Sequence, residues 1–156
     1  MSEKKELNNG QMKPEDTIDF HIRWAWYNIS RMYNMQASKF GGSMAIAITI
    51  LNIEKDGTPS TKLAPKMGME PRSLTRMIKT LEDNGVIEKK ADKLDKRMVR
   101  LFLTKEGKKL RKEATNIVVK FNQKIREEIP NKELEQCFNT LNKVNEIIDK
   151  NNIFNI

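Results

Sequence analysis

Residues that build disulfides, metal centres and many catalytic pairs are almost absent from this sequence. Among its 156 residues, Cys137 is the only cysteine and His21 the only histidine. A single cysteine excludes a disulfide within the chain, and neither residue has the neighbours that a zinc site needs. The two lie on separate predicted helices, a poor arrangement for a nucleophile and its base. With no Gly-rich phosphate loop either, we expect no catalytic residue, no metal, no cofactor and no enzyme.

Long apolar segments are also missing. The longest apolar run covers residues 44–51, which is far too short to span a bilayer. Residues 1–13 are polar and lack periodicity, so they predict a flexible tail and not a signal peptide. We therefore expect a cytoplasmic protein without membrane contact, folded as a single domain over residues 14–156.

Acidic residues are scarce in one block of the chain. Residues 58–112 contain 16 Lys or Arg and 7 Asp or Glu, whereas the remaining residues contain 13 and 14. The formal net charge of +8 is therefore concentrated in this block. A nearly neutral body with one basic module indicates a polyanionic partner.

Helix caps and breakers divide the chain into helices and one hairpin. Ser43 and Thr104 are typical helix N-caps, and Gly68 and Gly85 are typical helix ends. One helix begins at Ser60 or Thr61, and if it begins at Thr61, Pro65 lies among the first four positions, whose N–H groups have no helical partner, and its missing N–H costs little. The patterns predict helices at about 14–40, 43–54, 60–67, 71–83, 104–129 and 131–150, a turn at 56–59, and a hairpin at 86–103.

Two short helices followed by a hairpin predict a winged helix-turn-helix over about residues 43–104. The fold class is therefore mainly α with a small β-hairpin wing, and long helices at about 14–40 and 105–150 lie outside that lobe. The last helix carries more apolar surface than a small monomer needs to expose, which indicates dimerisation. This surface consists of Leu134, Phe138, Leu141, Val144 and Ile148, with Ile153, Phe154 and Ile156 at the C-terminus.

The helix over residues 71–83 separates into an apolar and a basic face. Leu74, Met77, Ile78 and Leu81 form the apolar stripe. The other face has no acidic residue before Glu82, and its long and short donors suit a helix in the major groove of DNA. The alternative is an ordinary solvated face, which usually also contains Asp or Glu. The predicted DNA contacts are Arg72, Ser73, Thr75, Arg76 and Lys79.

The hairpin is basic around its turn. Its predicted DNA contacts are Lys89, Lys93, Asp95, Lys96 and Arg97, with Lys90 and Arg100 adding further charge. Asp95 and Arg97 fall on one side of an extended strand, so Asp95 can orient an arginine toward the minor groove, which attracts guanidinium groups. The alternative is a charged hairpin that protects a sheet edge from aggregation.

The sequence resembles the MarR family of winged-helix transcriptional regulators. The matching segments are MGMEPRSLTRMIKTLEDNGVI and DKRMVRLFLTKEGKKL, which contain the family's wing pattern at Asp95, Arg97, Leu103, Thr104 and Gly107. The resemblance implies a homodimer whose first and last helices interlock and whose two lobes read a pseudo-palindromic operator in double-stranded DNA. It also implies that Arg97 enters the minor groove. Glu70 and Pro71 depart from the family pattern at the start of the recognition helix.

Many MarR relatives bind small aromatic compounds between the dimer helices and the DNA-binding lobe. Phe20, His21, Trp24, Tyr27 and Met44 are the residues expected at such a pocket, although core or dimer-interface packing is the alternative at this spacing. A hydrogen-bonded structural role is expected for His21, and packing for Cys137. The sequence thus predicts a homodimeric repressor released by a small molecule. The alternative is a winged-helix module that binds protein or RNA through its basic patch.

Overall fold

The computed structural model describes residues 12–150 of the chain. Most of the predicted tail and the apolar C-terminal residues Ile153, Phe154 and Ile156 lie outside the described range. The chain divides into two units, Met1–Thr115 and Asn116–Ile156, and each is described by itself.

The first helix begins later than predicted. A short 3-10 helix, η1 (Pro14–Asp16), precedes α1 (Ile18–Ser38), and Thr17 between them is extended, with φ −103° and ψ 144°. The Thr17 hydroxyl donates to the carbonyl of Pro14 at 2.8 Å. This local bond competes with helical continuation, so the prediction of one helix from Pro14 is wrong at its start.

The second helix, α2 (Met44–Asn52), confirms the predicted cap. The Ser43 hydroxyl accepts from the backbone N–H of Ile46 at 3.3 Å. The Asn34 side-chain oxygen accepts from the N–H of Met44 at 2.9 Å, which joins the start of α2 to α1. The helix ends two residues before the predicted end at about 54.

The helix-turn-helix consists of α3 (Ser60–Met67) and α4 (Pro71–Asp83). Gly68 ends α3 in the left-handed conformation, with φ 60°, as its position predicts. The helix begins at Ser60, the earlier of its two predicted starts, so Pro65 lies inside α3 and the low cost expected for a start at Thr61 does not apply. The carbonyl four residues before Pro65 loses its helical N–H partner.

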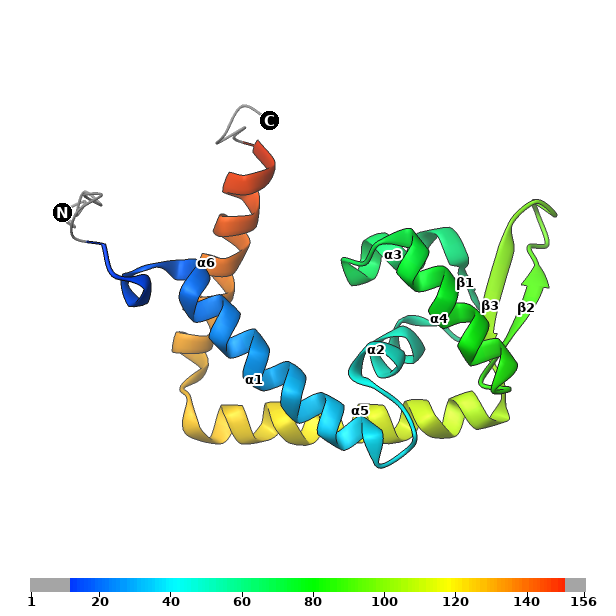
Figure 1. The fold of residues 1–156 in the computed structure, drawn as a ribbon, viewed down its shortest axis with the longest axis horizontal. Helices are drawn as coiled ribbons and strands as arrows, with labels where there is room; N and C mark the ends of the chain where they lie inside the picture. Colours follow the sequence, from blue (N-terminus) through cyan, green and yellow to red (C-terminus); the bar gives the residue numbers. More distant parts are fainter. Residues whose placement is uncertain (1–11, 151–156) are drawn as a thin grey trace. The chain divides into compact units, whose positions relative to one another are not determined.

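The wing belongs to a three-stranded antiparallel sheet in the order β1-β3-β2. The predicted hairpin is formed by β2 (Ile87–Ala91) and β3 (Val99–Leu103), and it lies beside α4 in Figure 1. The third strand, β1 (Thr58–Pro59), was predicted only as part of a turn. Thr58 pairs with Leu101 and Pro59 with Arg100, and two residues are too few to show a strand period.

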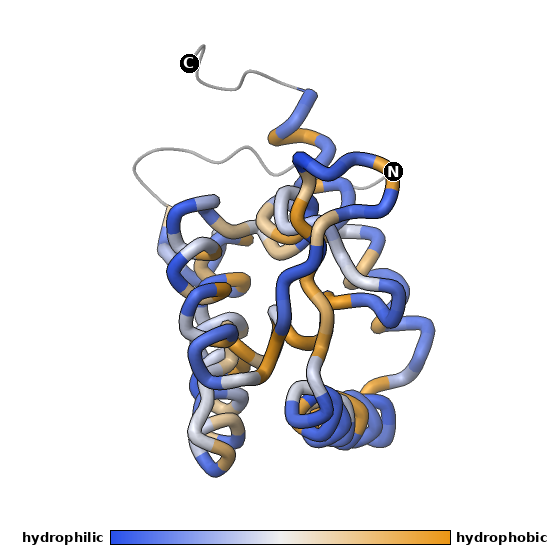
Figure 2. The backbone as a smooth tube through the Cα atoms, turned by 90° about the vertical axis from the view of Figure 1, so that its right-hand side faces the viewer, coloured by the Kyte–Doolittle hydropathy of each residue, from blue (hydrophilic) through white to orange (hydrophobic). Residues whose placement is uncertain are grey.

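The core of the first unit lies between the helix-turn-helix and the sheet. Its buried side chains are Ile50, Ile53, Leu63, Ala64, Leu74, Ile78, Leu81, Val86, Ile87, Leu101 and Leu103. Hydrophilic and hydrophobic residues alternate along the backbone, as the colouring of Figure 2 shows. The predicted stripe of α4 is confirmed, since Leu74, Ile78 and Leu81 are buried and Met77 packs against the core.

The last two helices are α5 (Lys105–Glu128) and α6 (Asn131–Lys150). The Thr104 hydroxyl accepts from the N–H of Gly107 at 3.2 Å, which confirms the predicted cap of α5. Gly107 lies directly against the carbonyl of Val86, so a side chain at this position would displace the backbone just before β2. No helix within residues 12–150 is long and apolar enough to cross a membrane.

Candidate nucleic-acid interface

The basic face of α4 is exposed along its length. The predicted contacts Arg72, Ser73, Thr75, Arg76 and Lys79 all lie on it. Within residues 12–150, no ion pair involves either arginine or Lys79, so their charges are available to a partner. The Thr75 hydroxyl donates to the carbonyl of Pro71 at 2.9 Å, which leaves its oxygen lone pairs as acceptors. This face therefore offers three cations and two hydroxyls.

The first turn of α4 lacks a side-chain cap. Glu70 occupies the N-cap position without a capping hydrogen bond, and Pro71 follows at the first helical position. The missing N–H of proline costs nothing there. The N–H of Ser73 in this turn donates to the carbonyl of Glu70 at 3.1 Å.

The wing loop, defined as residues 92–98, is organised around the buried carboxylate of Asp92. One carboxylate oxygen accepts from the N–H groups of Leu94 at 2.8 Å and Asp95 at 3.1 Å. The other oxygen accepts from the guanidinium of Arg100. The pKa of the Asp92 carboxyl is lowered to about 2, chiefly by the Arg100 hydrogen bond and next by the two N–H groups. Asp92 therefore stays charged wherever the protein is folded near neutral pH.

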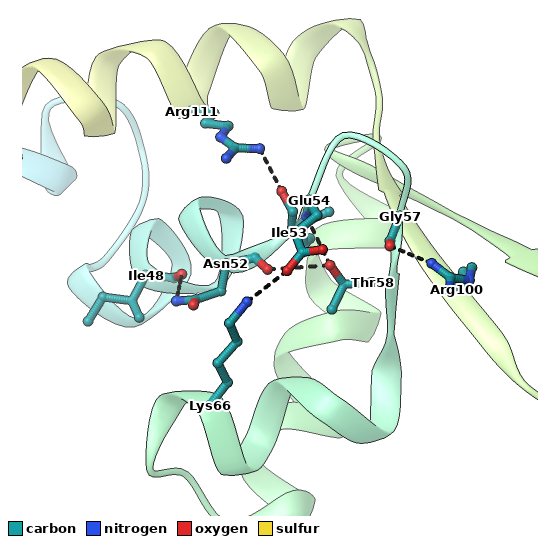
Figure 3. Close-up of polar contacts among 9 residues, drawn as sticks. All are labelled: Ile48, Asn52, Ile53, Glu54, Gly57, Thr58, Lys66, Arg100 and Arg111. Carbon is teal, nitrogen blue, oxygen red and sulfur yellow. Dashed lines mark hydrogen bonds and ion pairs between the residues drawn. The ribbon is translucent and has the colours of Figure 1, made fainter.

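Arg100 also joins the wing to the segment after α2. Its guanidinium donates to the carbonyl of Gly57 at 2.7 Å and to that of Asp56 at 3.3 Å. Figure 3 shows how Arg100, Lys66 and Arg111 approach residues 52–58 from three different elements. Lys66 pairs with Glu54 at 2.9 Å, and Arg111 donates to the carbonyl of Ile53 at 2.6 Å.

Gly57 is required beneath the wing for steric reasons. Its φ is 79°, and a side chain there would meet the ring of Phe102 on β3. The ammonium of Lys90, on β2, lies 5.1 Å from the centre of the same Phe102 ring. The base of the wing is therefore closely packed as well as hydrogen-bonded.

The predicted wing contacts differ in how they are engaged. Lys93, Lys96 and Arg97 are exposed and make no ion pair within the described chain. Lys89, in contrast, pairs with Glu82 of α4 at 2.6 Å. The Asp95 carboxylate accepts from the backbone N–H of Arg97 at 3.0 Å, so it orients the backbone of Arg97.

The sequence did not single out Asp92 and Arg100 as a pair. Arg100 was counted only as added charge, and Asp92 was assigned no role. Asp92 and Arg100 lie close together only because of the hairpin register, in which Ala91 pairs with Val99 and Lys90 with Arg100. Once that register is known, an acid at the turn and a base on the opposite strand are neighbours.

The residues expected at a ligand pocket are only partly brought together. Phe20, His21, Trp24 and Tyr27 form a series of edge-to-face ring contacts along α1, with ring centres 5.5–6.3 Å apart. Met44 starts α2 instead. His21 donates through Nε2 to the carbonyl of Glu15 at 2.8 Å, in agreement with the expected structural role.

A cavity of about 480 Å³ lies elsewhere in the first unit. It is lined by residues of α3 and of the segment after α2, including Glu54, Lys62 and Lys66, by Arg100 of β3, and by none of the predicted pocket residues. No group of three or more His, Cys, Asp or Glu within residues 12–150 is arranged to hold a metal ion.

The second unit exposes apolar residues along α6. Leu134 is buried and Val144 is half-buried, whereas Leu141, Phe138 and Ile148 are exposed at 37%, 50% and 61%. Cys137 is exposed as well, so the expected packing of its side chain is not formed among residues 12–150. The side chains of Phe138, Leu141 and Ile148 are thus exposed on α6.

Comparison with known proteins agrees with this geometry. The MarR family model matches residues 49–99, which contain α3, α4, β2 and the wing loop. No curated protein matches the sequence significantly. Solved structures of MarR-type regulators match the fold over most of the chain.

Three of these structures illustrate the match. A MarR/EmrR family transcriptional regulator from Acinetobacter sp. ADP1 has a TM-score of 0.78 at 22% identity, covering 90% of this chain and 100% of its own. The MepR–DNA complex of S. aureus has a TM-score of 0.76 at 19% identity, covering 85% and 98%. CouR from Rhodococcus jostii RHA1, bound to p-coumaroyl-CoA, has a TM-score of 0.75 at 22% identity, covering 86% and 95%.

The lobe of residues 44–103 is thus a winged helix, of the kind found in transcriptional regulators. The family match over residues 49–99 and the fold around it agree with the resemblance to the MarR family.

Proposed function

We propose that this chain is a sequence-specific DNA-binding transcriptional regulator that acts as a homodimeric repressor. The observation that carries the proposal is the face of α4, where Arg72, Arg76 and Lys79 are exposed without acidic partners. The unpaired cations of the wing lie on the same lobe. S. aureus MepR, which shares the fold, has been solved bound to DNA.

In this proposal α4 enters the major groove. Arg72 and Arg76 bind guanine edges or phosphates, and Ser73 and Thr75 contact bases or the backbone. Burial of Leu74, Ile78 and Leu81 fixes which face of the helix points outward. The apolar stripe thereby orients the donors before DNA arrives, which lowers the entropy cost of binding.

The wing supplies the second contact. Lys93, Lys96 and Arg97 approach the adjacent minor groove, where a guanidinium is attracted by the negative potential of narrow A·T-rich segments. Asp95 positions the backbone of Arg97 through its hydrogen bond to the N–H.

The dimer is formed through α6 and the other long helices. A symmetric interface covers the exposed side chains of Phe138, Leu141 and Ile148, with Leu134 and Val144 on the same side. Two lobes related by a two-fold axis read half-sites about 34 Å apart, so the operator is a pseudo-palindrome.

A small aromatic effector relieves repression in this proposal. The edge-to-face series of Phe20, His21, Trp24 and Tyr27 offers aromatic surface, with Met44 at the start of the next helix. CouR, of the same fold, has been solved with p-coumaroyl-CoA. Because both recognition helices must fit successive grooves, an effector that changes their separation by a few ångströms abolishes binding.

Selection from random duplex DNA at about 150 mM salt tests the proposal, with the mass of the protein in solution measured alongside. We expect enrichment of an inverted repeat bound by a dimer, with A·T-rich flanks that Arg97→Ala no longer favours. Binding without enrichment, lost steeply as salt rises, contradicts the proposal and leaves the basic block as a general polyanion or protein-binding patch.

A further inference from the structure

The tip of the wing presents a leucine completely to solvent. Leu94 is 98% exposed, more than any other large apolar side chain among the described residues. Leu101 and Leu103 of the same hairpin are buried in the core. A single exposed leucine is common on protein surfaces and carries no inference by itself.

The loop that carries Leu94 is fixed by hydrogen bonds on both sides of it. The N–H groups of Leu94 and Asp95 donate to the Asp92 carboxylate, whose second oxygen binds Arg100. The N–H of Asp92 donates to the carbonyl of Met98 at 2.9 Å. The N–H of Met98 donates to the carbonyl of Asp95 at 2.9 Å. The leucine therefore projects from an ordered turn anchored, through Arg100, to the segment after α2.

The surroundings of Leu94 are positively charged. Lys93 precedes it, and Lys96 and Arg97 follow within the same turn, all exposed and without ion pairs in the described chain. Such a tip is drawn toward a polyanion, and its apolar centre then meets that partner first. Apolar side chains that enter the minor groove partly unstack a base step and bend the duplex.

We propose that Leu94 is an apolar wedge that inserts into the minor groove at the base step under the wing. Pyrimidine–purine steps unstack most easily, so the wedge gives the protein a preference for these steps at positions where the wing makes no base-specific hydrogen bond. The inference rests on the proposed function and adds a source of specificity to it.

Parallel selections from one random duplex library compare the wild-type protein with two variants. Leu94→Ala removes the wedge, and Leu94→Met keeps an apolar side chain of similar volume. We expect wild type and Leu94→Met to enrich TA or CA steps in the flanks, and Leu94→Ala to lose that enrichment while keeping the inverted repeat. On the selected duplex, Leu94→Ala should bind about tenfold more weakly.

A base analogue locates the insertion directly. With 2-aminopurine placed at the flanking step of the selected duplex, wild type should raise its fluorescence by unstacking the step, and Leu94→Ala should not. Lys93→Ala is the matched control at the neighbouring position. It should reduce the salt dependence of binding and leave the fluorescence change intact.

The outcomes separate this inference from the proposed function. If Leu94→Ala selects the same flanks and gives the same fluorescence change as wild type, the wedge is disproved and the regulator remains. If wild type enriches no inverted repeat, both fail together. If Leu94→Ala alters only the mass of the protein in solution, the tip contacts protein, and the wedge is again disproved.

Discussion

Helix α4 and the wing loop both present exposed cations, but they are held in place by different forces. The orientation of α4 depends on apolar burial, since Leu74, Ile78 and Leu81 insert into the core. The shape of the wing loop depends on one carboxylate, because Asp92 binds Arg100 and two N–H groups of the turn. Apolar burial involves no titrating group, whereas an ion pair responds to pH and is screened by salt. The two parts of the interface can therefore be perturbed independently.

The largest expected effect comes from removing the support of α4. Leu81 is almost completely buried, so Leu81→Ala should lower the free energy of unfolding by about 2–5 kcal/mol through lost burial and a cavity. Urea denaturation followed by circular dichroism measures the loss. Thr80→Ala, at the neighbouring exposed position, should change stability by less than about 0.5 kcal/mol. A loss below about 1 kcal/mol for Leu81→Ala would show that α4 is oriented by something other than this packing.

The next effect is on binding and not on stability. Arg76→Ala should weaken binding to the selected operator by about 1–3 kcal/mol if Arg76 contacts a base, with a much smaller loss on random duplex. Fluorescence anisotropy on both duplexes measures the difference. Arg23→Ala, on α1, serves as a control and should leave both affinities unchanged. An equal loss on both duplexes for Arg76→Ala would assign this arginine to a phosphate instead.

Acid titration should affect the wing and spare α4. Folding lowers the pKa of Asp92 from 3.8 to about 2, so its contribution to stability is complete above about pH 4 and is lost as the pH falls toward 2. Asp92→Asn should therefore be less stable than wild type at pH 7, and the difference should shrink between about pH 4 and pH 2.

Urea midpoints of both proteins across that range test the titration. Leu81→Ala provides the contrast, because its deficit relative to wild type should not change with pH. A constant gap between Asp92→Asn and wild type would contradict the role assigned to the Asp92 charge.

The smallest effect distinguishes a paired from an unpaired lysine. Lys79 on α4 makes no ion pair among the described residues, whereas Lys89 on the wing is bound to Glu82. If Lys79 contacts a phosphate, Lys79→Ala should reduce the slope of log affinity against log salt by about 1. Lys89→Ala should reduce it less, since part of that charge is already neutralised. Equal slopes for the two variants would show that the Lys89–Glu82 pair opens on binding.

The sequence predicted α3, α4 and the hairpin because their signals are local. Glycines at the ends of the helices and an apolar stripe each act over a few residues. The same reasoning failed at the start of α1, where a single hydrogen bond from Thr17 outweighs the helical pattern. It also left the start of α3 open between Ser60 and Thr61, and this difference of one residue decides how far inside the helix Pro65 lies.

The missed parts of the interface depend on long-range pairing. Strand β1 exists only because β3 lies beside it, and the Asp92–Arg100 pair only because of the hairpin register. Neither feature is indicated by the residues next to it in the sequence. Composition did indicate that the block is basic, but only the structure separates engaged cations such as Lys89 from free ones such as Lys96.

The pairing of β1 with β3 also determines the order in which this lobe can fold. Thr58 and Leu101 are separated by α3, α4 and β2, so their pairing closes a loop that contains the whole helix-turn-helix. Closing such a long loop costs conformational entropy before the β1–β3 contact contributes any stability. The β2–β3 hairpin, in contrast, closes only a short turn. The hairpin can thus form early in synthesis or refolding, and the third strand joins it last. Partly folded chains will then expose the outer edge of β3, which makes this edge the site where association between unfinished copies should begin.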